Sequence, residues 1–180
     1  LAKQLPYSIH KPARHKFTRN HTYVGHIDQQ WQADLADMQA LANENDGYRY
    51  ILTCIDILSR YAWAIPVRSK GSKDMVIAFK KLFRTAHPRL PQRLQTDKGK
   101  EFFNREVSAL LRKHGVHHFA SNSDQTAAVV ERFNHTLKNR IWVHFTANHT
   151  KRYLEILPDT VYAYNHTFRR SIRMRPVDVN

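Results

Sequence analysis

Cysteine, glycine and long apolar runs are scarce in this 180-residue sequence, which has one cysteine and five glycines. Because Cys54 has no second cysteine in the chain, its residues cannot form a disulfide among themselves or a zinc site built on paired cysteines. We expect Cys54 to be a buried structural thiol, because it lies in an apolar run over residues 50–55. No run reaches the ~18 residues of a membrane-spanning helix, and the first thirty residues are too polar for a signal peptide. These features predict a soluble protein of a reducing, intracellular compartment.

Acidic residues are also few, with 15 Asp and Glu against 29 Lys and Arg, which gives a formal charge of +14. Such an excess of positive charge attracts polyanions. Nucleic acid is the first candidate, because neutralising its phosphates releases counterions and supplies affinity for any sequence. An anionic membrane surface is the rival partner. It is disfavoured because the basic residues are spread along the chain and do not gather in one amphipathic helix.

The first 28 residues differ in composition from the rest of the chain. They hold five Lys or Arg, four His and one acid, with little apolar periodicity. The four histidines follow no zinc-ligand spacing and have no accompanying cysteine. We therefore expect residues 1–28 to form a basic N-terminal arm or linker, and residues 29–180 to form one core domain.

Hydrophobic periodicity predicts an α/β domain. The predicted strands cover residues 31–38, 48–58, 61–67, 93–96 and 116–120. The predicted helices cover residues 72–86, 104–114, 127–148 and 153–168, and a polar loop covers 121–126. We expect Pro158 to kink the last helix or delay its start. The order of these elements predicts a five-stranded mixed sheet flanked by helices.

Three carboxylates stand out by their positions. Asp34 lies inside a predicted strand, where a buried charge is costly without a partner or a metal. Asp97 follows a strand directly, at the end where open α/β sheets present ligands. Glu131 lies in the first turns of the long helix, where the helix dipole alone would favour an acid. For each of them a solvated surface charge is the alternative interpretation.

Three short segments carry a family resemblance. The segments are Trp-Gln-Ala-Asp at 31–34, Gln-Thr-Asp-Lys-Gly-Lys-Glu-Phe at 95–102 and Val-Glu-Arg-Phe-Asn at 130–134. In this order they resemble the catalytic core of retroviral-type integrases, and more closely the integrases of Polinton/Maverick DNA transposons. The tail over residues 164–176 resembles the end of that core.

The resemblance implies an RNase H-like fold and a metal-dependent polynucleotidyl transferase. Asp34, Asp97 and Glu131 would be the catalytic DDE carboxylates that hold two Mg²⁺ or Mn²⁺ ions in each active site. Asn134 and Lys138 would line the DNA, because they share a helix face with Glu131. A solvated helix face is the alternative for Lys138.

Arginines near the end of the sequence predict further DNA contacts. Arg169, Arg170 and Arg173 cluster there, and contacts of this kind position DNA through its phosphates without reading its sequence. The alternative is that they bond carbonyls at a helix end or contact another subunit.

By resemblance, the protein is expected to be an integrase that trims transposon ends and joins their 3′-hydroxyls to target DNA. Its implied partners are double-stranded DNA and further copies of itself, in a homodimer or tetramer, without a membrane. Its implied location is the nucleus. Two alternatives stay open: a catalytically silent DNA-binding protein derived from a transposon, and an RNase H-like nuclease acting on RNA–DNA hybrids.

Overall fold

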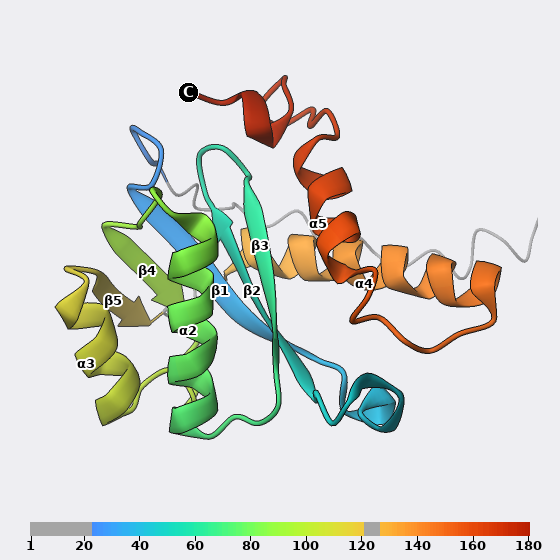
Figure 1. Cartoon of the computed structure of the whole chain (residues 1–180). Helices are drawn as coiled ribbons and strands as arrows, with labels where there is room; N and C mark the ends of the chain where they lie inside the picture. Colours follow the sequence, from blue (N-terminus) through green and yellow to red (C-terminus); the bar gives the residue numbers. More distant parts are fainter. Residues whose placement is uncertain (1–22, 121–126) are drawn as a thin grey trace, which may run out of the picture.

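A five-stranded mixed sheet forms the centre of the structure, a computed structural model that describes residues 23–120 and 127–180 (Figure 1). The strands are β1 (Gln30–Asp37), β2 (Tyr50–Asp56), β3 (Ala62–Val67), β4 (Arg93–Thr96) and β5 (His117–Ala120). They lie in the order β3-β2-β1-β4-β5. The first three strands are antiparallel to one another, whereas β4 runs parallel to β1 and β5 parallel to β4. The predicted α/β fold class with a mixed sheet is confirmed.

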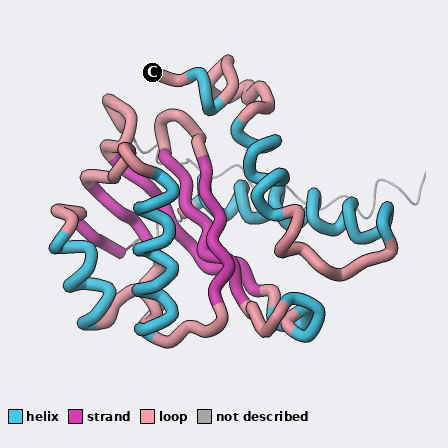
Figure 2. The backbone as a smooth tube through the Cα atoms, viewed as in Figure 1, coloured by secondary structure: helices cyan, strands magenta, loops and turns pink. Residues whose placement is uncertain are grey.

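Helices cover both faces of this sheet, which gives the three layers seen in Figure 2. The α-helices are α2 (Ser72–Ala86), α3 (Arg105–Lys113), α4 (Ala128–Asn148) and α5 (Leu157–Asn165). Short 3₁₀ helices are η1 (Gln39–Leu41), η2 (Asn43–Asn45) and η3 (Pro176–Asp178). One apolar cluster joins the sheet to α2 and α3, and a second joins its other face to α4 and α5. Within residues 23–120 and 127–180, no helix is both long and apolar enough to cross a bilayer.

Alternation along β1 separates the two clusters. Trp31 and Ala33 belong to the cluster under α2 and α3, whereas Ala36 belongs to the cluster under α4. This is the period of two that a strand imposes on its side chains. Trp31 stacks on Trp63 of β3, with ring centroids 4.3 Å apart. The face of β1 turned to α4 therefore carries the even-numbered residues, among which is Asp34.

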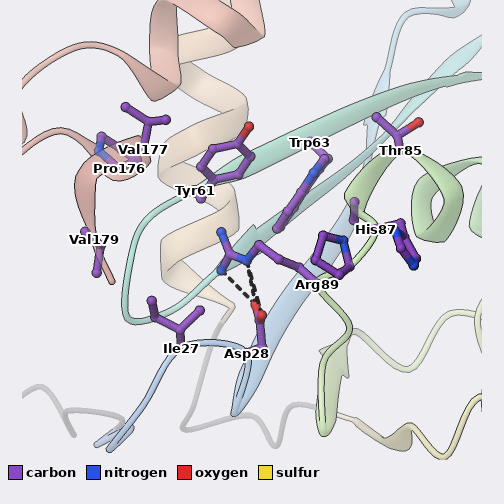
Figure 3. A pocket seen from close by; sticks show the side chains of 12 residues that line it. Ile27, Asp28, Tyr61, Trp63, Thr85, His87, Arg89, Pro176, Val177 and Val179 are labelled. Atoms are coloured by element: carbon purple, nitrogen blue, oxygen red, sulfur yellow. Dashed lines mark hydrogen bonds and ion pairs between the residues drawn. The ribbon is translucent and has the colours of Figure 1, made fainter.

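Ion pairs of Arg89 join the segment before β1 to the end of β2, and Figure 3 shows the pair with Asp28. Arg89 pairs with Asp28 at 2.7 Å and with the fully buried carboxylate of Asp56 at 3.2 Å. Its guanidinium also lies over the rings of Tyr61 and Trp63, 5.2 and 5.1 Å from their centroids. Asp28, Arg89 and the two rings line a pocket of about 430 Å³ between β3, the segment after α2 and the C-terminal residues.

Element boundaries differ from the sequence prediction mainly in the last helix. The predicted helix over 153–168 extends only over Leu157–Asn165, with Pro158 in its first turn. Pro158 delays the start of this helix as predicted, because it has no N–H to donate to the carbonyl of Leu154. Buried Asn45 accepts the backbone N–H of Tyr153 at 2.8 Å and that of Leu154 at 3.3 Å, which holds the segment before the helix. The strand predicted over 48–58 is also shorter, at Tyr50–Asp56. The predicted loop 121–126 and residues 1–22 of the predicted arm lie outside the described residues.

Candidate active site

Asp34 is held at the middle of β1 with its carboxylate turned toward α4. Its Oδ1 accepts the backbone N–H of Leu35 at 2.8 Å, and its Oδ2 accepts the Asn134 side-chain N–H at 2.7 Å. Asn134 lies in the second turn of α4 and is only 9% exposed. The carboxylate is therefore fixed between a strand and a helix, with part of its surface still open to solvent.

Asp97 comes directly after β4, the strand next to β1. The parallel register pairs Gln32 with Gln95, so continuing it by two residues sets Asp34 level with Asp97. Oδ1 of Asp97 accepts the backbone N–H of Gly99 at 3.0 Å, and the side chain is exposed. The sheet thus brings two carboxylates from adjacent strands to one place.

The charge of Asp97 acts on the carboxylate of Asp34. Burial raises the pKa of Asp34, and the negative charge of Asp97 raises it further. Hydrogen bonds from Leu35 and Asn134 and the positive charge of Lys138 act in the opposite direction without cancelling the rise. Two carboxylates that repel each other in a partly buried place are relieved by a cation between them.

The donor set of this pair fits a hard divalent cation. Carboxylate oxygens are the ligands that Mg²⁺ and Mn²⁺ prefer. The same region holds an unpartnered acceptor, because Oδ1 of Asn134 is buried without a hydrogen bond. Glu131 is exposed in the first turn of α4. Among residues 23–120 and 127–180, no three His, Cys, Asp or Glu side chains come together as metal ligands. The structure therefore groups Asp34 and Asp97 with Asn134 and Lys138, whereas the predicted role of Glu131 stays a prediction.

Gln32, which sequence reasoning missed, fixes the beginning of α4. Its Oε1 accepts the backbone N–H groups of Val129 and Val130, each at 3.1 Å. Its Nε2 donates to Oε1 of Gln95 on β4 at 3.0 Å. The residue before the helix, Ala127, has no side chain that could cap these N–H groups. The sequence signal was a polar residue two places before Asp34, and therefore on the same face of β1.

Replacing Gln32 by leucine is expected to lower the free energy of unfolding by about 2–3 kcal/mol, because it leaves buried N–H groups of α4 without an acceptor. Urea denaturation measures this change. The matched control is Gln92→Leu, which makes the same replacement at an exposed position just before β4. If Gln32→Leu loses no more stability than this control, the side chain does not anchor the helix.

The three C-terminal arginines lie elsewhere on the molecule. Arg169 follows α5 and stacks on Tyr164, whereas Arg170 and Arg173 are exposed in the turn that follows. No hydrogen bond or ion pair in the described part of the chain joins them to Asp34 or Asp97. Their predicted DNA contact therefore stays a prediction.

Comparison with known families agrees with this arrangement. Residues 26–125, more than half of the chain, match the family described as the integrase core domain. The chain belongs to this family. This integrase core is 35% identical over 142 residues to an uncharacterized transposon-derived protein of Caenorhabditis elegans, covering 79% of the chain and 49% of that protein. It is 30% identical over 126 residues to the Pol polyprotein of radiation murine leukemia virus, covering 67% and 21%.

Solved integrase structures share its fold. A chain of the simian T-cell lymphotropic virus intasome in complex with a PP2A regulatory subunit superposes with a TM-score of 0.77 and 18% identity, covering 93% of this chain and 60% of that one. The HTLV-2 integrase catalytic core domain in complex with magnesium, in a trimeric form, gives a TM-score of 0.70 and 15% identity, covering 84% and 95%. The RNase H-like fold of integrase cores is thus confirmed. The chain spans about half of the Caenorhabditis elegans relative and about a fifth of the polyprotein.

Proposed function

We propose that this integrase core is a metal-dependent polynucleotidyl transferase that trims transposon DNA ends and joins their 3′-hydroxyls to target DNA by two-metal phosphodiester transfer. The observation that carries the proposal is the proximity of Asp34 on β1 to Asp97 just after β4, in a chain of the integrase core family. We also propose that this chain is related most closely to Polinton/Maverick integrases. The relative described as transposon-derived supports a transposon origin.

The three carboxylates would hold two metal ions between them. Asp34 and Asp97 would hold one Mg²⁺ or Mn²⁺, and Glu131 would help to hold the second ion of the DDE site. Two such cations, when bound, activate the attacking oxygen and stabilise charge on the entering and leaving oxygens.

The chain's own groups would keep the site ready for this chemistry. The amide of Asn134 fixes the orientation of the Asp34 carboxylate from α4. The charge of Lys138 lies near enough to Asp34 to lower its pKa, so it would also attract a phosphodiester that approaches the carboxylates. Gln32 would keep α4, and with it Glu131 and Asn134, in place against the sheet.

Double-stranded DNA is the proposed substrate, both as transposon ends and as target. The formal charge of +14 supports it, and Arg169, Arg170 and Arg173 are proposed phosphate contacts. Joining two DNA ends calls for at least two active sites, so we propose a homodimer or tetramer that works in the nucleus. Residues 1–28 would be a basic arm that leads into the core at 29–180.

The first test is nicking and strand transfer on duplex DNA in Mg²⁺ or Mn²⁺, comparing the wild type with Glu131→Gln. We expect the variant to lose activity about a hundredfold or more, because it weakens a metal ligand that stabilises the transition state. The matched control is Glu106→Gln, the same replacement in the exposed first turn of α3. Equal activity of wild type and Glu131→Gln would contradict the role of Glu131.

Two further results would decide between this function and its alternatives. Faster cleavage of RNA–DNA hybrids than of duplex DNA would indicate an RNase H-like nuclease. Failure to bind Mg²⁺ or Mn²⁺, even with DNA present, would leave a DNA-binding protein without catalysis.

A further inference from the structure

Four arginines from three segments of the chain lie close to Tyr164 of α5. These residues, which we call the arginine cluster, are Arg60 in the turn between β2 and β3, Arg132 and Arg140 on α4, and Arg169 after α5. Arg169 stacks on the Tyr164 ring, and Arg140 bonds Thr160 and Thr167 on either side of it. Arg132 is next to Phe133, whose ring contacts Tyr164, and Arg60 precedes Ala62, which bonds Asn165.

Burial raises the pKa of the Tyr164 phenol, and the charge of each of the four arginines acts against that rise. Of these arginines, only Arg169 was singled out by the sequence. With 3.6 residues per turn, Arg140 lies on nearly the opposite side of α4 from Lys138.

The guanidinium groups of the cluster have hydrogen-bond donors to spare. The guanidinium of Arg169 lies 3.8 Å from the centre of the Tyr164 ring and donates to the Tyr164 carbonyl at 3.1 Å. The two side-chain hydrogen bonds of Arg140 are long, at 3.5 and 3.4 Å. The Nε atoms of Arg60 and Arg169 are buried without any acceptor. A buried donor without a partner costs free energy, so these atoms favour an incoming acceptor.

No carboxylate neutralises the cluster. In the described ranges 23–120 and 127–180, none of its four members forms a salt bridge. The acid that acts on Arg60 is Asp56, but its carboxylate already accepts from Ser59 and pairs with Arg89. Burial lowers the pKa of Arg60, and repulsion by Arg132 lowers it further. An anion at this place would relieve both effects.

The cluster is held in place without a ligand. Buried Asn165, at the end of α5, donates to the carbonyl of Ala62 and accepts its N–H, each at 2.9 Å. This clamp fixes α5 against the beginning of β3, two residues after Arg60. Arg60 has a left-handed backbone, with φ at 61°, which a residue with a side chain keeps only when its surroundings hold it there. Figure 1 shows α5 lying across α4 near this strand. The site is therefore preorganised.

We propose that the arginine cluster is a phosphate-binding site, separate from the Asp34–Asp97 pair, and that it takes a backbone phosphate of double-stranded DNA. Guanidinium groups match phosphate oxygens in a bidentate geometry, and several of them around one place can each donate to the oxygens of one phosphate. DNA bound there would run along the side of α4 turned away from Lys138. The choice of DNA rests on the proposed function, whereas the phosphate chemistry does not.

The test compares Arg60→Gln/Arg169→Gln with the wild type in two binding experiments, both in EDTA. Calorimetry with tripolyphosphate probes the phosphate site alone, and we expect the double variant to bind about tenfold or more weakly because it loses charge-assisted hydrogen bonds. Fluorescence anisotropy with a short DNA duplex over a range of salt probes DNA. There we expect the slope of log K against log[salt] to fall by about 1, as for one lost phosphate contact. The control is Arg105→Gln on α3, which removes one positive charge outside the arginine cluster and should keep the wild-type slope.

Each outcome bears on the proposal in a defined way. Tripolyphosphate binding as tight as that of Arg105→Gln would overturn the site. Lost tripolyphosphate binding with an unchanged DNA slope would support a phosphate site but overturn DNA as its source in favour of a free phosphate compound. Circular dichroism checks the fold, and if the double variant does not fold, Arg140→Gln takes its place in both experiments. Because no metal is present, failure of the proposed catalysis would not change either result.

Discussion

Replacing Arg89 by methionine is expected to lower the free energy of unfolding by about 3–5 kcal/mol, because it leaves a buried carboxylate without its countercharge. That carboxylate is Asp56, which is 0% exposed and lies 3.2 Å from the Arg89 guanidinium. The same replacement breaks the 2.7 Å ion pair with Asp28 and removes the stacking on Tyr61 and Trp63. Methionine keeps most of the side-chain volume, so the loss reports on charge and hydrogen bonding more than on packing.

Urea denaturation of Arg89→Met measures this loss. Arg105→Met makes the same replacement at an exposed site and should change stability by less than about 0.5 kcal/mol. Adding Asp56→Asn to Arg89→Met should restore part of the stability, since the buried group is then neutral. A loss of under about 1 kcal/mol, or no recovery in the double variant, would show that Asp56 is stabilised by its hydrogen bonds from Ser59 and the Asp28 N–H without Arg89.

Replacing Asp34 by asparagine is expected to lower DNA nicking and strand transfer about a thousandfold or more, while the metal-free protein becomes more stable. Activity falls because the substitution removes an anionic oxygen ligand. Stability rises because burial and the charge of Asp97 both disfavour the ionised Asp34 carboxylate. The new amide can also donate to the unpartnered Oδ1 of Asn134 once that amide rotates.

The pH dependence follows from the direction of the same pKa shift. A carboxyl whose pKa is raised on folding binds more protons in the folded state, so its contribution to stability is lost as pH rises from the unfolded value near 3.8 through the folded pKa. Without metal, the wild type should therefore lose stability relative to Asp34→Asn as pH rises through this window. Mg²⁺ must displace that proton, so its affinity for the wild type should fall as pH is lowered through the folded pKa.

Thermal unfolding with and without Mg²⁺, from pH 4 to 7, measures both effects. Mg²⁺ should raise the midpoint of the wild type at neutral pH and leave that of Asp34→Asn unchanged. Asp37→Asn is the matched control, since this exposed carboxylate lies on the same strand. If Asp34→Asn keeps the full rise of the unfolding midpoint with Mg²⁺, Asp34 is not a ligand of the ion.

The sheet could be predicted from the sequence because its signals are local. The β-branched and aromatic run of β2, and the apolar spacing of α2, depend only on neighbouring residues. Pro158 likewise predicted the late start of α5. The hydrogen bond that Asn45 accepts from the N–H of Tyr153 could not be predicted, because the two residues are 108 positions apart. Polar side chains that reach across the fold leave no periodic pattern.

In the candidate site, too, local sequence signals could be predicted and contacts between distant residues could not. Asp34 and Asp97 could be singled out because each lies in or directly after an apolar strand, and parallel pairing of those strands then sets them level. The place of Glu131 relative to them stays a prediction. Nothing in the sequence around Arg60 or Arg140 indicates that the two converge on Tyr164, because their meeting depends on how α4 and α5 cross.

The side-chain amide of Gln32 connects β1, β4 and α4. It donates to Gln95 of β4 and accepts two backbone N–H groups in the first turn of α4. The height at which α4 meets the sheet is therefore set by a side chain of the sheet, and not by the length of chain that leads into the helix. Insertions or deletions between β5 and α4 could then accumulate over evolution while Asn134 keeps its hold on Asp34. The hold of Asn134 on Asp34 is thus expected to tolerate a change in the length of the connection that enters α4.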